Sequence, residues 1–434
     1  MDLAPDAVAV IGFVVLFALM LLRVPVGMAM GLVGVSGFGY LVGAGPALKM
    51  VGQTSMRIVT DYTFGVIPMF LLMGAFVSRS GMSRELFRAA NTFVGHLRGG
   101  LGIATIAACA GFAAISGSSV ATAATFSTVA YPEMRRFDYP QSFATGVIAA
   151  GGTLGAMFPP SIVLAVYGLI TQQDIGKLFI AGVLPGLLAV SMYMATIFII
   201  GRVRPRFLPA APRSSWAERW GAAREVWAPL ALFVFVIGGL YGGLFTPTEA
   251  GGMGAGGAFL LSIARRRLSR ADILESLLQA TRTAAAVFTV LIGAILFGYF
   301  LTVTQTPQNV TAFVTGLGLG RYGVLAVIMV MYLALGCLMD AIAMIILTVP
   351  IIFPVITSLG FDPVWFGVII VMTVELGLIH PPVGMNVFVI KTVVKDVSFS
   401  TIFLGVIPFV LTDITRLVVL IAFPAIALWL PGRM

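Results

Sequence analysis

The chain has 434 residues, of which 59% are hydrophobic and only 10% are charged. Ordinary globular proteins carry about 25% charged residues, and the mean hydropathy here is +1.05, so the composition excludes a soluble multidomain protein. A membrane-spanning helix needs about 20 apolar residues, which leaves room for roughly ten to twelve crossings. The sequence therefore predicts an all-α polytopic membrane protein.

Cysteines and histidines are too few for several classes of site. Cys109 and Cys337 lie in apolar segments, and His96 and His380 are the only histidines, which excludes a disulfide framework and a cysteine or histidine metal centre. No nucleophile–base pair supports an enzyme, so we expect no catalytic residues and no cofactor. The pI of 9.9 does not indicate nucleic acid, because the basic residues lie in short loops between apolar segments, where they set membrane topology.

The first predicted elements are three spans, at about 7–22, 24–42 and 60–78. No basic segment precedes the first apolar run, so we expect a span there and not a signal peptide. Basic clusters follow at 79–98, 135–136, 202–224, 265–282 and 391–395. The positive-inside rule places these clusters in the cytoplasm, and two further spans, about 226–244 and 248–264, then turn outside at 246–249.

Two stretches within the basic clusters, 84–98 and 268–281, mix charged with spaced apolar residues. This pattern fits an amphipathic helix on the cytoplasmic membrane face. It fits a solvated loop equally well.

The chain contains a sequence repeat at an offset of 222 residues. TLGAMFPPSIVLA at 153–165 aligns with ELGLIHPPVGMNV at 375–387, and the same offset brings Ser118 onto Asp340. It also carries the third span onto about 282–300, which begins at a basic cluster, whereas the third span ends at one. The two copies therefore cross the membrane in opposite directions, as the inverted repeats of secondary transporters do.

Each copy contains two segments that an ordinary span would not. The first, at 100–131 and 323–356, has a polar or small-residue centre and begins and ends on one side, which fits a re-entrant hairpin of two half-helices. The second is a span broken by a Pro-Pro pair, which removes two N–H donors. Unpaired backbone is tolerated at this depth only around a cavity or inside protein. Its carbonyls and helix ends are suited to bind a cation and an anion.

Acidic residues within the apolar segments are the main single candidates. Asp340 is the strongest, because a carboxylate in an apolar segment is by default assigned an ion or substrate role. Glu375 fits either a ligand or a hydrogen-bonding anchor, and residues 116–119 fit either a site or small-residue helix packing. We expect one ion pair within a helix, between Asp413 and Arg416.

Several motifs resemble one transporter family: SGSSVATAAT at 116–125, GTLGAMFPPSIVLAVYG at 152–168, FTPTEA at 245–250 and ELGLIHPPVGMNVFVI at 375–390. The chain is similar over nearly its whole length to the large permease subunit of tripartite ATP-independent periplasmic (TRAP) transporters. The resemblance implies sodium-coupled import of an organic acid (a C4-dicarboxylate, a keto acid or a sugar acid) across the bacterial inner membrane by an elevator movement. It also implies two partners, a four-helix small membrane subunit on a separate chain and a periplasmic substrate-binding protein.

The resemblance further implies a sodium and substrate site with one half from each copy. The first half comprises Ser116, Gly117, Ser118, Ser119, Gly152, Thr153, Gly155, Pro159, Pro160 and Ser161. The second comprises Asp340, Glu375, Gly377, His380, Pro381, Pro382, Gly384 and Asn386. His380 stands where the family commonly has threonine. No Lys or Arg lies in either hairpin or break, so we expect bound sodium to help hold the anion.

We divide the chain accordingly into four parts. They are N-terminal scaffold helices with an amphipathic helix (1–98), the first inverted repeat (99–201), a cytoplasmic loop with two scaffold spans and an amphipathic segment (202–282), and the second repeat with a C-terminal span (283–434). The alternative interpretation is a stand-alone carboxylate or ion symporter or antiporter of the same architecture.

Overall fold

A computed structural model describes residues 4–205, 207–336, 339–382 and 384–433, which form helices and no strands. The N-terminal part holds α1 (Pro5–Leu21), α2 (Val26–Val42), α3 (Ala44–Thr60), η1 (Tyr62–Gly65), α4 (Val66–Arg79), α5 (Met82–Val94), α6 (Gly100–Ser116), α7 (Ser119–Arg136), α8 (Gln141–Met157), α9 (Ile162–Thr171), α10 (Ile175–Val203) and α11 (Trp216–Glu225). The C-terminal part holds α12 (Trp227–Tyr241), α13 (Pro247–Ala264), α14 (Arg270–Val303), α15 (Thr306–Gly316), α16 (Gly320–Gly336), α17 (Ala341–Ser358), α18 (Pro363–Ile379), α19 (Met385–Val393), α20 (Phe399–Ala422), α21 (Ala425–Leu428) and η2 (Pro431–Arg433).

By length and apolar composition, six of the described helical segments can cross a membrane, or seven if the bent pair α11–α12 is one span. Five further apolar helices have at most 17 residues, which is at the short end for a bilayer. The expected ten to twelve crossings are reached only if these shorter helices also cross. The protein is multi-pass, and three of its short apolar helices, α6, α16 and α18, belong to the hairpins and broken spans.

The repeat found in the sequence extends over the helices. The offset of 222 residues carries the bounds of α7 onto those of α17 and the bounds of α8 onto those of α18. It also carries α1 onto α12, and α2 onto α13, to within two residues at each end. The correspondence in helix bounds therefore extends to the first two helices.

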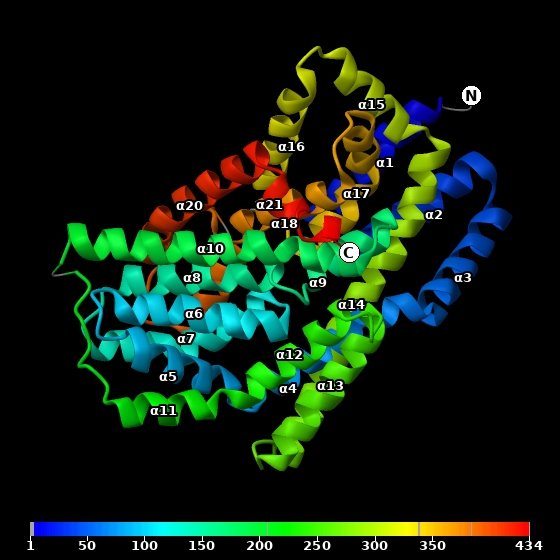
Figure 1. Cartoon of the computed structure of the whole chain (residues 1–434). Helices are drawn as coiled ribbons and strands as arrows, with labels where there is room; N and C mark the ends of the chain where they lie inside the picture. The colour runs from blue at the N-terminus through cyan, green and yellow to red at the C-terminus, as the bar shows by residue number, and fades with distance from the viewer. Residues whose placement is uncertain (1–3, 206, 337–338, 383, 434) are drawn as a thin grey trace.

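Equivalent helices of the two halves make equivalent contacts. Helix α2 runs along α14, and α4 runs along α13 (Figure 1). Each of these two pairs combines one helix from the first half with one helix from the second, and the four helices form one layer. In the other layer, α9 packs on α17 and α19 packs on α7. Each broken span thus touches the hairpin of the opposite half. The two halves are interlocked and do not form separate lobes.

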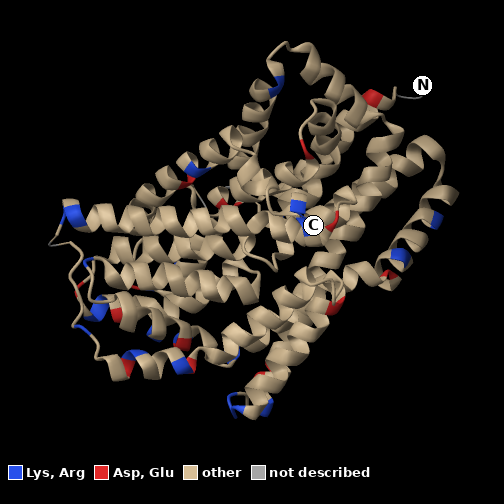
Figure 2. Cartoon of the chain, in the orientation of Figure 1, with Lys and Arg blue, Asp and Glu red and all other residues tan. Residues whose placement is uncertain are grey.

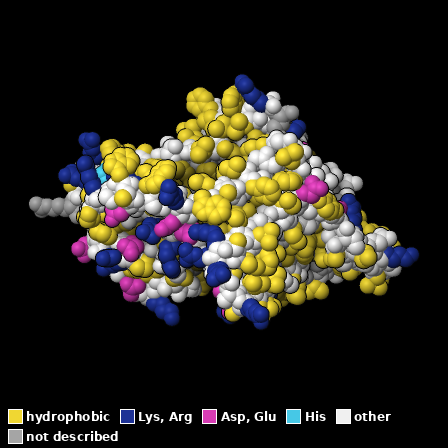
Figure 3. Space-filling view, turned by 60° about the horizontal axis from the view of Figure 1, so that its bottom comes forward, with side chains coloured by type: hydrophobic (Ala, Val, Ile, Leu, Met, Phe, Trp, Pro, Cys, Tyr) yellow, Lys and Arg dark blue, Asp and Glu magenta, His cyan; other side chains and the backbone are white. Residues whose placement is uncertain are grey.

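Three of the predicted cytoplasmic clusters meet on one face of the molecule. Arg265 forms a bidentate pair with Glu85, with N···O distances of 2.7 and 2.9 Å. Arg79 Nη1 lies 2.5 Å from Glu275 Oε2, and Arg88 Nη1 lies 2.9 Å from Glu225 Oε1. Charged residues are concentrated at helix ends and connecting segments (Figure 2), and they gather beside a broad apolar surface in the view of Figure 3. This grouping agrees with a common side for the three clusters.

The amphipathic stretches are helical. Residues 84–98 fall mostly in α5, whereas 268–281 form the beginning of the 34-residue helix α14 and are continuous with a span. A capping box explains this start, because the Ser269 hydroxyl accepts from the Asp272 N–H and the Asp272 carboxylate accepts from the Ser269 N–H. Helices α3 and α15 had no counterpart in the spans expected from the sequence. The division into scaffold and repeat parts stays a prediction.

Candidate functional site

The tip of the first hairpin lies between α6 and α7. Helix α6 ends at Ser116, Gly117 takes a left-handed conformation with φ of 60°, and Ser118 caps α7. The Ser118 hydroxyl accepts from the Ala121 N–H at 3.3 Å. A serine cap that follows a glycine in this conformation ends one helix and starts the next within two residues.

The Pro-Pro break of the same half lies directly against this tip. Helix α8 ends at Met157, and Ser161 starts α9 by accepting from the Leu164 N–H at 3.1 Å. The Ile162 N–H donates to the Gly117 carbonyl oxygen at 3.5 Å. A Cβ added at Gly155 would lie 2.5 Å from the carbonyl group of Ser118, so glycine is required for the approach of the two backbones.

The first half of the predicted site is enclosed within the protein. Ser118 is half-buried, and the other nine predicted residues of this half are buried. The α8–α9 span is almost entirely buried. Of its most apolar stretch of 18 residues, 94% are buried, against 28–61% of the corresponding stretch in the other five long spans. Hydroxyl and carbonyl oxygens therefore meet at the centre of the protein, where hard oxygen ligands for a small cation are expected.

The second half has a similar construction but is more open. Asp340 caps α17 by accepting from the Ile342 and Ala343 N–H groups, both at 3.2 Å, and it is exposed. Gly336 and Gly377 bring α16 against α18, because a Cβ on Gly377 would lie 2.8 Å from the Gly336 Cα.

The break of the second half lies partly at the surface. Pro381 and Pro382 are exposed, and His380 Nδ1 lies 2.6 Å from the carbonyl oxygen of Pro381. Gly384 starts α19 at φ of 56°. Residues 337–338 and 383 lie outside the described part of the chain, so the centre of this tip is not described.

Asn386 connects the second half to the first. Its side chain is fully buried at the start of α19, and its Nδ2 donates to the Ala149 carbonyl oxygen of α8 at 3.5 Å. This contact joins residues 237 positions apart. A Cβ on Gly152 would lie 3.0 Å from the same Nδ2, so predicted site residues of the two copies come together at this point of the core.

Thr153 and Glu375, the aligned residues of the two breaks, belong to a buried polar cluster. The Thr153 hydroxyl lies 3.2 Å from that of Tyr193, which donates to Asp413 at 2.7 Å. The expected pair between Asp413 and Arg416 is present at 3.0 Å, and Arg416 also lies 3.4 Å from Glu375. No pattern in the sequence singled out Tyr193, which is a tyrosine within an apolar span.

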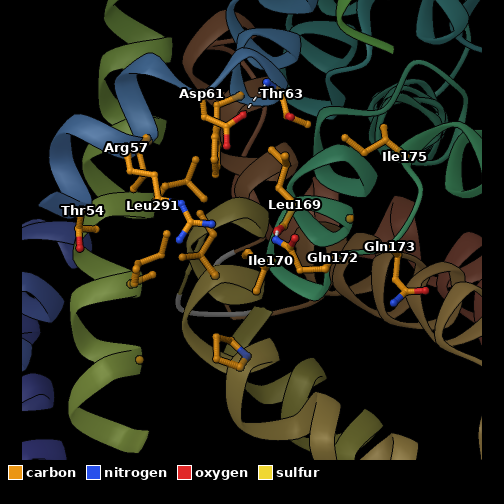
Figure 4. Close-up of a pocket in the computed structure, with 18 of the residues that line it drawn as sticks. Thr54, Arg57, Asp61, Thr63, Leu169, Ile170, Gln172, Gln173, Ile175 and Leu291 are labelled. Atoms are coloured by element: carbon orange, nitrogen blue, oxygen red, sulfur yellow. Dashed lines mark hydrogen bonds between the residues drawn. The ribbon is translucent and has the colours of Figure 1, made fainter. Parts of the chain in front are cut away.

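A pocket of about 780 Å³ lies elsewhere, between α3, α9, α14, α17 and the turn at 246–248. The Arg57 side chain extends into it from α3, opposite Gln172 at the end of α9 (Figure 4). Arg57 forms no ion pair with any described residue, whereas Asp61 and Asp174 in the lining each accept a backbone N–H from the helix they start. None of the predicted site residues lines this pocket.

The profile of the family described as "Tripartite ATP-independent periplasmic transporter, DctM component" matches residues 13–426. The chain belongs to this family.

Two relatives of this TRAP large permease are named as C4-dicarboxylate TRAP transporter large permease proteins. The one from Pseudomonas aeruginosa is 41% identical over 372 residues, covering 86% of each chain. The one from Rhodobacter capsulatus is 35% identical, covering 98% of this chain and 99% of its own. Among solved structures, the YdaH transporter of Alcanivorax borkumensis superposes with a TM-score of 0.52 at 14% identity, covering 89% of this permease and 90% of that chain. That likeness concerns the fold alone.

Proposed function

We propose that the protein is the large permease subunit of a sodium-coupled importer of an organic acid in a bacterial inner membrane. The main observation in support is the paired construction of the site, in which Ser118 meets Gly155 in one half and Gly336 meets Gly377 in the other. Two hairpins held against two interrupted helices provide backbone carbonyls and helix ends that can bind a cation and an anion. Family membership supports the same conclusion, and the two relatives above favour a C4-dicarboxylate as the acid.

Sodium coupling has a physical basis in the charges of the site. Hairpin residues 100–131 and 323–356 and the two breaks contain no Lys or Arg, and the guanidinium of Arg416 is fully buried between two carboxylates. A helix N-terminus contributes only about 0.3–1 kcal/mol to binding an anion when exposed and up to ~2 kcal/mol when partly buried. The field of bound sodium ions is therefore proposed to supply most of the attraction for the acid.

The pocket at Arg57 fits an outer vestibule through which the acid approaches. The predicted topology puts the turn at 246–248, which forms part of its lining, outside the membrane. Arg57 is its one cation among the described lining residues. A carboxylate can pair with this guanidinium and then move inward between the two layers by the elevator movement that the family resemblance implies.

Binding of the acid to the purified permease complex in sodium and in choline buffer tests the proposal. We expect affinity to fall at least tenfold without sodium, and lithium to substitute poorly. Equal affinity in both buffers would contradict sodium coupling and point to a fixed cation of the protein.

The partners are proposed from the family: a four-helix small membrane subunit and a periplasmic substrate-binding protein. Co-purification of the permease with the candidate partners, from membranes of cells that express all three proteins, tests this assembly. Sodium-driven uptake by the permease alone, at the rate of the complete system, would instead support a stand-alone symporter.

A further inference from the structure

The two breaks carry aligned polar residues that point into one buried cluster. Thr153 lies on α8, two residues before Gly155, and Glu375 lies on α18, two residues before Gly377. Each of these glycines is a position where its helix closely approaches a hairpin. A side chain anchored here fixes the helix within one turn of its contact with the hairpin.

The cluster is a continuous chain of contacts across four helices. Tyr193 of α10 donates its hydroxyl hydrogen to Asp413 of α20 at 2.7 Å. Its oxygen lies 3.2 Å from the Thr153 hydroxyl, which also donates to the Ala150 carbonyl oxygen at 2.7 Å. Arg416, one turn after Asp413, connects Asp413 at 3.0 Å with Glu375 at 3.4 Å. The Tyr193 hydroxyl and the Arg416 guanidinium thus form a polar connection between α8 and α18, which also pack directly on each other.

The charges in the cluster make these links costly to break. The Arg416 and Glu375 side chains are 0% exposed and that of Asp413 is 1% exposed. Glu375 has Arg416 as its only charged partner among the described residues, and its Oε1 makes no hydrogen bond there. Removing one partner from a buried ion pair leaves an uncompensated charge in a low-dielectric interior, which is strongly unfavourable.

We propose that Arg416 and Tyr193 are positioning residues for transport, which hold the two breaks at a fixed separation so that both halves of the site move and bind as one body. Occupation of one half then depends on the geometry of the other, although the two halves are 222 residues apart in the sequence. The inference rests on the proposed function for its assay. It assigns to Thr153 and Glu375 a connecting role in place of direct contact with sodium.

The test is a double-mutant cycle in the KM for the acid, measured in vesicles containing the complete transporter at saturating sodium. Thr153→Val and Glu375→Gln are made singly and together, first in the natural background and then with Tyr193→Phe. We expect each single variant to raise KM severalfold. The factor by which the double variant raises KM should be at least five times smaller than the product of the two single factors. In the Tyr193→Phe background the two factors should multiply.

The controls separate positioning from a general loss of structure. Tyr139→Phe removes another buried hydroxyl, which donates to the Pro209 carbonyl oxygen at 2.7 Å. Tyr139 belongs to neither break, so this variant should leave KM unchanged. If Glu375→Gln does not accumulate, the pair Thr153→Val and Tyr193→Phe replaces it, with the same expectation of non-multiplying effects. Multiplying effects in the natural background would overturn the inference. Absence of uptake by the unaltered complex would instead contradict the proposed function.

Discussion

Ser118 and Asp340 occupy the same position in the two halves of the protein. Each follows the tip of a hairpin, and each caps the helix after it, Ser118 by one backbone N–H and Asp340 by two. The equivalent position is a half-buried hydroxyl in the first half and an exposed carboxylate in the second. The two halves therefore share backbone geometry and differ in the charge that they bring to the site.

Asp340→Asn is expected to weaken the response to sodium and leave the fold intact. Asparagine and aspartate cap helices about equally well, so stability should change by less than about 0.5 kcal/mol. Loss of a charged oxygen near the cation should raise the half-saturating sodium concentration roughly tenfold, which corresponds to about 1.4 kcal/mol. Uptake into vesicles over a series of sodium concentrations measures this half-saturating concentration.

Asp362→Asn provides the matched control for this change. Asp362 is also exposed and caps α18 with two backbone N–H groups, at 2.8 and 2.9 Å. It lies outside both hairpins and both breaks, so its replacement should leave sodium dependence unchanged. An unaltered sodium dependence in Asp340→Asn would remove this carboxylate from the ion site.

Gly155→Ala is expected to separate the first hairpin from the first break. The new methyl group would lie 2.5 Å from the Ser118 carbonyl, and such overpacking typically costs about 1–3 kcal/mol. Since the backbones must move apart, uptake should fall at least tenfold while the protein still inserts. Gly252→Ala on α13 is the control, because an added Cβ there meets no atom within 4 Å. Equal uptake by the two variants would show that this close contact is dispensable.

Arg57→Gln is expected to raise the KM for the acid about tenfold. A hydrogen bond to a charged group is worth about 1.5–3 kcal/mol, and this guanidinium extends into the vestibule pocket without an ion-pair partner among the described residues. Lys49→Gln serves as the control, since Lys49 is an exposed cation of the same helix outside the pocket. A KM that rises equally in both variants would indicate a general electrostatic effect. An unchanged KM in Arg57→Gln would exclude a vestibular site.

Cysteine labelling tests the predicted topology. In a chain without Cys109 and Cys337, Thr246→Cys should react with a membrane-impermeant reagent from outside, and Ser215→Cys only after the membrane is opened. Both residues are exposed helix caps that form capping boxes, with Glu249 and Glu218 respectively, so the two substitutions disturb comparable structures. Reaction of Ser215→Cys in intact cells would reverse the orientation assigned from the arginine clusters.

The sequence by itself determined the helical membrane architecture, the repeat and the positions of the tips and breaks. These depend on neighbouring residues: hydropathy over about 20 positions sets a span, proline removes backbone donors, and serine or aspartate starts a helix by binding its first N–H groups. Residues Ser118, Ser161 and Asp340 all begin helices in this way. The expected ion pair between Asp413 and Arg416 is equally local, because residues three apart share one helix face.

Only the tertiary structure decided which side chains meet across the two halves. Tyr193 and Asp413 are 220 positions apart, and Asn386 and Ala149 are 237 apart, so no local pattern brings them together. The same holds for Arg57, which extends into a pocket built from helices throughout the chain. The continuation of 268–281 into the span of α14 also lay beyond the local pattern, since an amphipathic stretch fits a surface helix or the end of a longer one. Burial decides such cases, because a buried polar group needs a partner and packing alone determines which partner is within reach.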